Sequence, residues 1–202
     1  MDMVLWLILW IPFDLRWSMD LHLSLNYNWW SMGISVIAII GSYGYRNAKI
    51  GINLVPKFKD VYIALFALVM IMVVTIPPGI ITGFLTFAIP GTFNIQESAI
   101  HFIGLFLTVA LPEELFFRGL LLRGLEQVSS KKWVPMAVSS LAFGLMHWNN
   151  ISGLDMQITY VFLATLAGLG YGWAYKKSGN NLLAAILTHT LVDWIWKLVL
   201  VG

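Results

Sequence analysis

The chain has 202 residues, of which 59% are hydrophobic and 11% are charged, and its formal net charge is +2. Soluble globular domains carry about 25% charged residues, so this composition excludes a water-soluble globule and favours a protein of the lipid bilayer. The small net charge and the lack of a long Lys or Arg run give no indication of a nucleic-acid partner. Cysteine is absent, which excludes cysteine nucleophiles, disulfides and cysteine-rich metal sites.

Seven apolar stretches follow one another and predict an all-α, polytopic transmembrane helical bundle, which we treat as one membrane-embedded domain over residues 1–202. Most approach the roughly 20 residues that a helix needs to cross about 30 Å of hydrocarbon. Pro77-Pro78 should kink the third stretch or split it into two half-helices, which leaves an eight-span count open. The stretches cover residues about 2–13, 28–45, 61–89, 99–122, 133–148, 154–175 and 181–201.

The connections between the stretches alternate in charge and predict an orientation. Three connections carry Lys and Arg, and the two between them carry one acidic residue each. The positive-inside tendency then places the N-terminus in the cytoplasm and the C-terminus outside. The first stretch lacks a basic start and a small-residue cleavage site, so we interpret it as a retained span rather than a signal peptide. The basic connections are 46–60, 123–132 and the one starting at Lys176, and the others are 90–98 and 149–155.

Small residues recur at one spacing in the sixth stretch. Ala164, Gly168 and Gly172 are four residues apart and therefore share one face of a helix. Small side chains at this spacing let two helix backbones approach closely in lipid, so they predict a packing contact.

Six ionisable side chains fall inside the predicted spans. A charge at a helix centre costs roughly 2.5–3.5 kcal/mol even on the lenient insertion scale, so these groups need partners or a water-filled cavity. At about 1.5 Å per helical residue, three separate helices carry most of them to a layer roughly 12–21 Å from the basic side. This clustering makes a functional site the default hypothesis. The six residues are Glu113, Glu114, Arg118, His147, His189 and Asp193.

Spacing within the helices predicts which of these side chains share a helix face. Glu114 and Arg118 are four residues apart, as are His189 and Asp193, so each pair shares a helix face. Glu113 is turned about 100° from Glu114 and can face elsewhere. The Glu114–Arg118 pair could be purely structural, and Asp193 could act directly or only as a partner of His189.

These side-chain positions suggest roles for the residues in a hydrolytic reaction. Arg118 would hold Glu114 ionised, and Glu113 with His147 would deprotonate a water molecule. His189 would donate a hydrogen bond to a developing oxyanion. The sequence lacks Gly-x-Ser-Gly, Gly-x-Gly-Asp and His-Glu-x-x-His, the motifs of serine, aspartyl and zinc proteases of membranes.

Over residues 100–195, approximately, the chain resembles the type II CAAX prenyl endopeptidase and bacteriocin-processing family, also called CPBP or Abi. That family carries three motifs in this order, each on its own helix. Each motif alone is weak, but three in order at these separations are specific. Here they read Glu113-Glu114-x-x-x-Arg118, Phe143-x-x-x-His147 and His189-x-x-x-Asp193.

The resemblance implies an intramembrane endopeptidase that hydrolyses membrane-associated or lipidated peptides, of the CAAX type or as in bacteriocin processing, with a catalytic core at about 99–201. Its partners would be the lipid bilayer and a peptide or protein substrate. Glu113 and His147 would position and activate the water, and His189 with Asp193 would line the oxyanion hole. The implied supporting residues are Glu114 and Arg118.

Two points of chemistry stay open. An ionised Asp193 cannot donate a hydrogen bond to an oxyanion as an asparagine could, so it is either kept protonated or only orients His189. Zinc could in principle be held by Glu113, His147 and His189, but no adjacent pair of ligands forces this, and we expect no metal or other cofactor.

Two other kinds of function fit the same composition. The chain could be a non-enzymatic membrane scaffold or bacteriocin-immunity protein in which the polar cluster is only structural. It could also carry protons or ions by means of the buried carboxylates, although the lack of an inverted internal repeat argues against a transporter.

Overall fold

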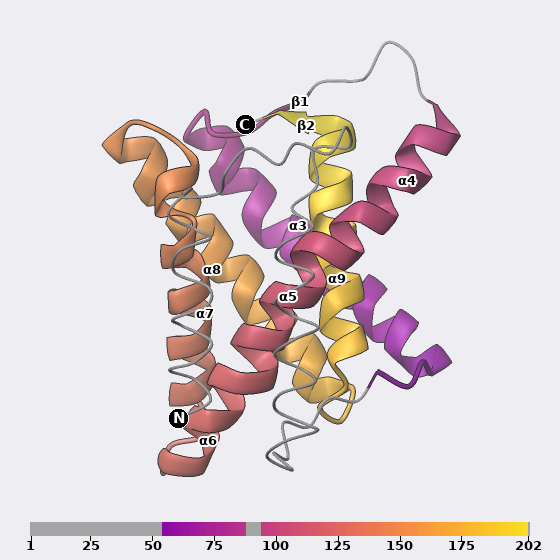
Figure 1. The fold of residues 1–202 in the computed structure, drawn as a ribbon. Helices are drawn as coiled ribbons and strands as arrows, with labels where there is room; N and C mark the ends of the chain where they lie inside the picture. The colour runs from indigo at the N-terminus through magenta and orange to yellow at the C-terminus, as the bar shows by residue number, and fades with distance from the viewer. Residues whose placement is uncertain (1–53, 88–93, 202) are drawn as a thin grey trace, which may run out of the picture.

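The computed structural model describes residues 54–87 and 94–201, and within them the chain folds into a bundle of helices (Figure 1). The predicted stretches at 2–13 and 28–45 lie outside the described residues. A continuous helix comprises α4 (Ile95–Leu105), η2 (Phe106–Ala110), α5 (Leu111–Glu114), η3 (Leu115–Leu122) and α6 (Arg123–Val128). The other elements are α3 (Phe58–Ile81), α7 (Val134–Met146), η4 (Trp148–Asn150), α8 (Leu154–Lys177), α9 (Leu182–Val199), β1 (Thr86–Phe87) and β2 (Leu200–Val201).

The third predicted stretch, 61–89, forms one helix that ends earlier than expected. Pro77 and Pro78 lie inside α3, which continues to Ile81 rather than splitting into half-helices. Each proline removes one backbone hydrogen bond from the preceding turn, and the helix ends one turn after them, at Ile81. The Thr82 hydroxyl then donates to the Pro78 carbonyl at 2.8 Å, and Gly83 adopts a left-handed φ of 70° that glycine tolerates without strain.

Two short strands show that the predicted helix ends at 82–87 and 200–201 are wrong. Thr86 and Phe87 form β1, which pairs antiparallel with β2 in the register Thr86–Val201 and Phe87–Leu200. This pairing joins the chain after α3 to the end of α9. Two-residue strands of this kind depend on a contact between distant segments, which local periodicity does not reveal.

The predicted stretch 99–122 is part of a longer helix with unusual winding. The helix runs over 34 residues from Ile95 to Val128, and the Asn94 side chain caps it by accepting from the backbone N–H groups of Gln96 and Glu97. The segments η2 and η3 are π-helical and flank α5. The π-helix is rare and often marks functional sites, and α5 carries the acid pair.

The helix α8 packs against α3, α7 and α9. Ala164, Gly168 and Gly172 are buried, which confirms the predicted packing role of these small residues. A Cβ atom added at Gly168 would lie 3.3 Å from the Cα atom of Ser140 on α7. A side chain at this point would require the neighbouring atoms to shift by a few tenths of an ångström, so glycine favours the close approach of the two backbones.

The packing of α7 against α8 also predicts the effect of Gly144→Ala. The added Cβ atom would lie 2.5 Å from the Val161 carbonyl oxygen and against Thr165 Oγ1. We expect a loss of about 1–3 kcal/mol, as for other overpacked sites, measured as earlier thermal unfolding in detergent. Gly124→Ala is the matched control, because its Cβ would meet no described atom within 4 Å, and alanine favours a helix. Equal unfolding temperatures for Gly144→Ala and the unaltered protein would contradict the predicted clash.

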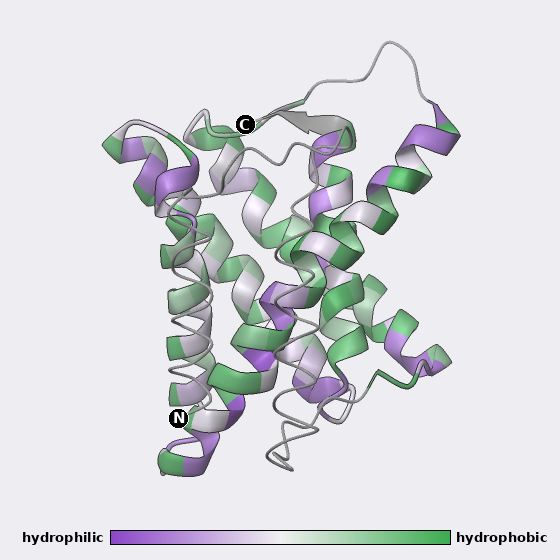
Figure 2. Cartoon of the chain, viewed as in Figure 1, coloured by the Kyte–Doolittle hydropathy of each residue, from purple (hydrophilic) through white to green (hydrophobic). Residues whose placement is uncertain are grey.

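The outer surface of the bundle is largely apolar. Large apolar side chains along α3 are exposed, among them Phe58, Tyr62, Val69 and Val73. Within the described residues, α3 and the continuous helix 95–128 are long and apolar enough to cross a bilayer. Figure 2 shows hydrophilic residues at the helix ends and at α5, midway along the bundle. This distribution agrees with the membrane protein that the composition predicts.

Candidate active site

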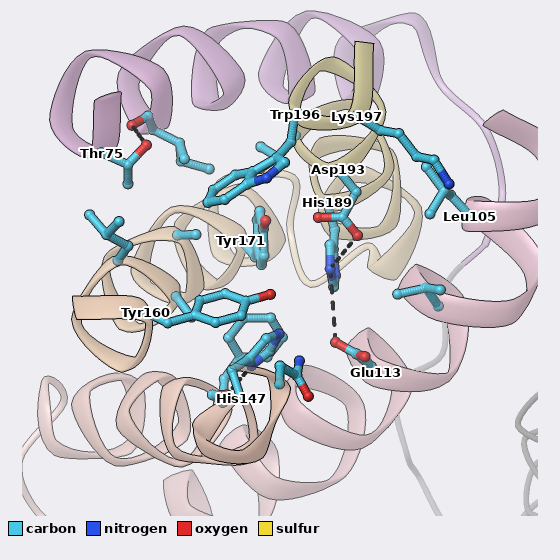
Figure 3. A pocket seen from close by; sticks show the side chains of 18 residues that line it. Thr75, Leu105, Glu113, His147, Tyr160, Tyr171, His189, Asp193, Trp196 and Lys197 are labelled. Atoms are coloured by element: carbon cyan, nitrogen blue, oxygen red, sulfur yellow. Dashed lines mark hydrogen bonds and ion pairs between the residues drawn. The ribbon is translucent and has the colours of Figure 1, made fainter. Parts of the chain in front are cut away.

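A cavity of about 550 Å³ lies between the helices, and five of the polar side chains that line it come from four separate parts of the chain. Glu113 belongs to α5, His147 follows α7, Tyr160 belongs to α8, and His189 and Asp193 belong to α9. Figure 3 shows these side chains converging on one space. The predicted residues Glu113 and His147 therefore line the same cavity rather than opposite sides of the bundle.

The Glu114–Arg118 pair lies behind the cavity, fully enclosed. Their side chains are 0% and 1% exposed, and the Arg118 Nη1 donates to Glu114 Oε1 at 2.8 Å. A second guanidinium nitrogen donates to the Gly168 carbonyl at 2.7 Å, and the guanidinium lies 4.8 Å from the centre of the Phe143 ring. The i,i+4 spacing thus gives the predicted contact, and Arg118 also connects η3 to α8.

Glu114 contacts His189 as well, which the sequence did not indicate. His189 Nδ1 lies 2.9 Å from Glu114 Oε1. The imidazole stacks on Tyr171 with ring centres 4.5 Å apart and planes 14° apart. Glu114 therefore bridges Arg118 and His189, and it fixes the second histidine in place.

The other nitrogen of His189 faces two more carboxylates. Nε2 lies 3.3 Å from Asp193 Oδ2, as expected for residues four apart on one helix face, and 3.8 Å from Glu113 Oε2. Carboxylates accept hydrogen bonds, and an imidazole donates from both nitrogens only as the imidazolium cation. The arrangement therefore fits a cationic His189 held among three carboxylates.

Glu113 faces the cavity while Glu114 faces away from it. The Glu113 side chain is 21% exposed. Its Oε2 atom has no hydrogen-bond partner in the part of the chain that the structure describes. Buried carboxylate oxygens usually have partners, whereas this one has only the longer approach of His189 Nε2 at 3.8 Å.

His147 occupies the C-cap of α7 with φ −86° and ψ 0°. Its Nδ1 lies 2.8 Å from the Phe143 carbonyl oxygen. A carbonyl can only accept, so Nδ1 donates, and the neutral ring keeps Nε2 as an acceptor. The backbone carbonyl four residues before His147 therefore sets the tautomer, and the Phe143 ring packs against the imidazole with centres 4.8 Å apart. The sequence did not indicate the tautomer.

Tyr160 and Asn150 also line the cavity and were not identified from the sequence. Tyr160 is an isolated tyrosine in an apolar stretch, which is typical of ordinary packing. Asn150 lies three residues after His147 in a predicted connection. Neither position carries a spacing signal, because their relation to Glu113 arises from the packing of segments that are far apart in the sequence.

The residues present do not form the zinc site considered above. Both nitrogens of His189 face carboxylates at 2.9 and 3.3 Å, so neither offers a lone pair to a metal. Across residues 54–87 and 94–201, no group of three or more His, Cys, Asp or Glu side chains is arranged to hold a metal ion.

The combination of a carboxylate and an imidazole acceptor around one cavity can bind a water molecule and remove its proton. Comparison with protein families places this site within a known group of sequences. A family model described as type II CAAX prenyl endopeptidase Rce1-like matches residues 95–195, half of the chain and the part that contains all three motifs. A search of curated proteins found no match to the chain, and a search of solved structures found none either.

Proposed function

Because the chain belongs to the Rce1-like family of type II CAAX prenyl endopeptidases, we propose that it is an intramembrane endopeptidase that hydrolyses membrane-associated or lipidated peptides. The observation that carries this proposal is the meeting of Glu113 and His147 at one cavity. Its walls are otherwise mostly apolar, as suits an extended apolar peptide segment.

In the proposed reaction, Glu113 is the general base. A water molecule lies between the Glu113 carboxylate and the Nε2 acceptor of His147. As the water oxygen bonds to the scissile carbonyl carbon, one water proton passes to Glu113. When the carbon–nitrogen bond breaks, Glu113 returns that proton to the leaving amine. The place of Glu113 in the cavity lining and its partly exposed side chain support this role.

The residues around His189 position its imidazole beside Glu113 and balance the buried charges there. Glu114 and Asp193 hold the imidazole at its two nitrogens, and Arg118 balances the charge of Glu114. The contact of Asp193 with His189 favours the alternative in which Asp193 orients the histidine. A cationic His189 beside Glu113 also offsets the cost of a second buried carboxylate.

The proposed enzyme is a multi-pass membrane protein whose N-terminus lies in the cytoplasm. The apolar outer faces of the described helices support this placement. Basic residues lie near one end of the bundle, with Lys131 and Lys132 before α7 and Lys176 and Lys177 at the end of α8. These connections agree with a cytoplasmic end under the positive-inside tendency.

A library of membrane peptides tests the proposal. Protein in lipid vesicles is incubated with the library, and the products are read by mass spectrometry. We expect discrete cleavage by the unaltered protein and a rate about 10²–10⁴-fold lower for His147→Ala, because the imidazole acceptor is lost.

The position of the cut identifies the substrate class. A cut near the carboxyl terminus would indicate CAAX-type substrates, and a cut after a leader segment would indicate peptide maturation. An identical product pattern and rate in His147→Ala would refute the proposed site.

A further inference from the structure

The side of the cavity around Glu113 is rich in acceptors and poor in available donors. Glu113 and Asp193 present carboxylates, and both nitrogens of His189 already face carboxylate oxygens. Lys197 also lines the cavity, but its ammonium end lies beside Leu105, away from the gap between His147 and His189 (Figure 3). A carbonyl oxygen that gained negative charge here would need a hydrogen-bond donor from another wall.

Tyr160 provides such a donor from α8, across the cavity. Its hydroxyl points toward the gap between His147 and His189 (Figure 3). The ring packs against Phe84, His147 and Trp196 with centres 5.1, 5.2 and 6.3 Å apart. These three contacts hold the phenol in one orientation, so its hydroxyl is already directed at the cavity before a substrate binds.

Asn150 lines the same cavity as Tyr160, with its side chain within reach of that hydroxyl. Asn150 ends η4, directly after the His147 cap of α7. The amide is neutral, and it can both donate and accept. Asn150 therefore ties the orientation of the Tyr160 hydroxyl to the backbone turn that also positions His147.

We infer that Tyr160 is a further catalytic residue, whose hydroxyl donates a hydrogen bond to the oxyanion of the tetrahedral intermediate, and that Asn150 is its positioning residue. This inference rests on the proposed endopeptidase function. When the water oxygen bonds to the carbonyl carbon, the π-electron pair of the carbonyl moves to its oxygen. That oxygen accepts a hydrogen bond from the phenol, which keeps its proton. The pair returns to re-form the carbonyl as the carbon–nitrogen bond breaks and the amine leaves with the proton from Glu113.

The aspartate at position 193 explains why a donor from another helix is needed. A carboxylate at Asp193 cannot donate to an oxyanion, and in this chain it contacts His189 instead. A neutral hydroxyl on the facing helix supplies the missing hydrogen bond without adding charge to a cavity that already contains two carboxylates.

Tyr160→Phe tests the inference, because it removes only the hydroxyl and keeps the three ring contacts. Loss of one oxyanion donor costs about 10²–10³-fold in kcat, and we expect a fall of this size with KM within about threefold of the unaltered value. Tyr175→Phe is the matched control. Tyr175 is a buried tyrosine on the same helix that does not line the cavity, so its variant should keep full activity.

Asn150→Ala provides a second, independent measurement. We expect a smaller fall in kcat, and no further fall when it is combined with Tyr160→Phe, because both changes act on the same hydrogen bond. Inhibition by a peptide phosphinate, which mimics the tetrahedral anion, should weaken in Tyr160→Phe by the same factor as kcat. Additive losses in the double variant would overturn the positioning role of Asn150.

Three results would overturn the role of Tyr160. They are a kcat of Tyr160→Phe close to that of the unaltered protein, a change confined to KM, or unchanged phosphinate inhibition. If Tyr160→Phe keeps its activity while His147→Ala loses it, the oxyanion role fails and the proposed function stands. If the unaltered protein cleaves no library peptide, the proposed function itself fails, and this inference fails with it.

Discussion

Replacing Glu113 by glutamine is expected to abolish peptide cleavage while the bundle stays folded. Glutamine keeps the shape of the side chain, but its amide cannot take a proton from water. The loss of a general base lowers rates by about 10²–10⁴-fold, and we expect a fall in kcat of this size. Steady-state cleavage of a peptide identified in the library experiment, measured in lipid vesicles, gives the value, and thermal unfolding of the same sample reports on the fold.

Glu126→Gln is the control for this change. Glu126 belongs to the same continuous helix, but it pairs with Lys176 at 2.8 Å, with both side chains about one third exposed. Such surface pairs contribute little to stability, and Glu126 does not line the cavity. Full activity in Glu126→Gln together with near-complete loss in Glu113→Gln would locate the effect at the cavity. Normal cleavage by Glu113→Gln would exclude the glutamate-activated water.

Arg118→Met is expected to produce the largest loss of stability. The change removes the guanidinium partner of the Glu114 carboxylate, which is 0% exposed, and the hydrogen bond to the Gly168 carbonyl. Glu114 then has only His189, which also faces Glu113 and Asp193, so the buried cluster has more negative than positive charge. Breaking a buried ion pair from one side costs about 3–5 kcal/mol, because an uncompensated charge stays in the interior. Thermal or denaturant unfolding in detergent micelles, followed by circular dichroism, measures this loss.

Two further variants show whether the buried charge is the cause. Lys176→Met makes the same kind of substitution in the partly exposed pair with Glu126, and we expect it to change the free energy of unfolding by less than about 1 kcal/mol. Adding Glu114→Gln to Arg118→Met removes the stranded charge and should recover part of the loss. Equal stability of Arg118→Met and Lys176→Met would show that the buried pair makes no special contribution.

Contacts within one helix could be predicted from the sequence. Glu114 with Arg118, and His189 with Asp193, are four residues apart, and both pairs meet in the structure, because the helical period fixes which residues share a face. The Glu114–His189 contact joins residues 75 positions apart. It depends on how α9 rotates and packs against α5, and periodicity contains no information about that rotation.

The same limit explains the unpredicted parts of the fold. Apolar composition indicated each of the five described helical regions, but the end of α3 and the β1–β2 pair depend on local hydrogen bonds and on a contact between distant segments. Tyr160 gave no signal, since a tyrosine in an apolar helix is common and only its position opposite His189 distinguishes it. Within the described residues, α3 and the helix 95–128 are long and apolar enough to cross a bilayer. The spans expected at α7, α8 and α9, the stretches at 2–13 and 28–45, and the count of seven spans stay predictions.

The π-helical segment η2 affects the direction in which the Glu113 side chain points. A π turn closes its hydrogen bond over one more residue than an α turn, so η2 shifts the azimuth of every later side chain relative to α4. One residue corresponds to a rotation of about 100° around an α-helix. The direction of Glu113 therefore depends on the number of residues between Gly104 and Pro112, and not only on the presence of a glutamate. A one-residue deletion in η2 would leave all three motifs intact in the sequence and still turn the carboxylate away from the water.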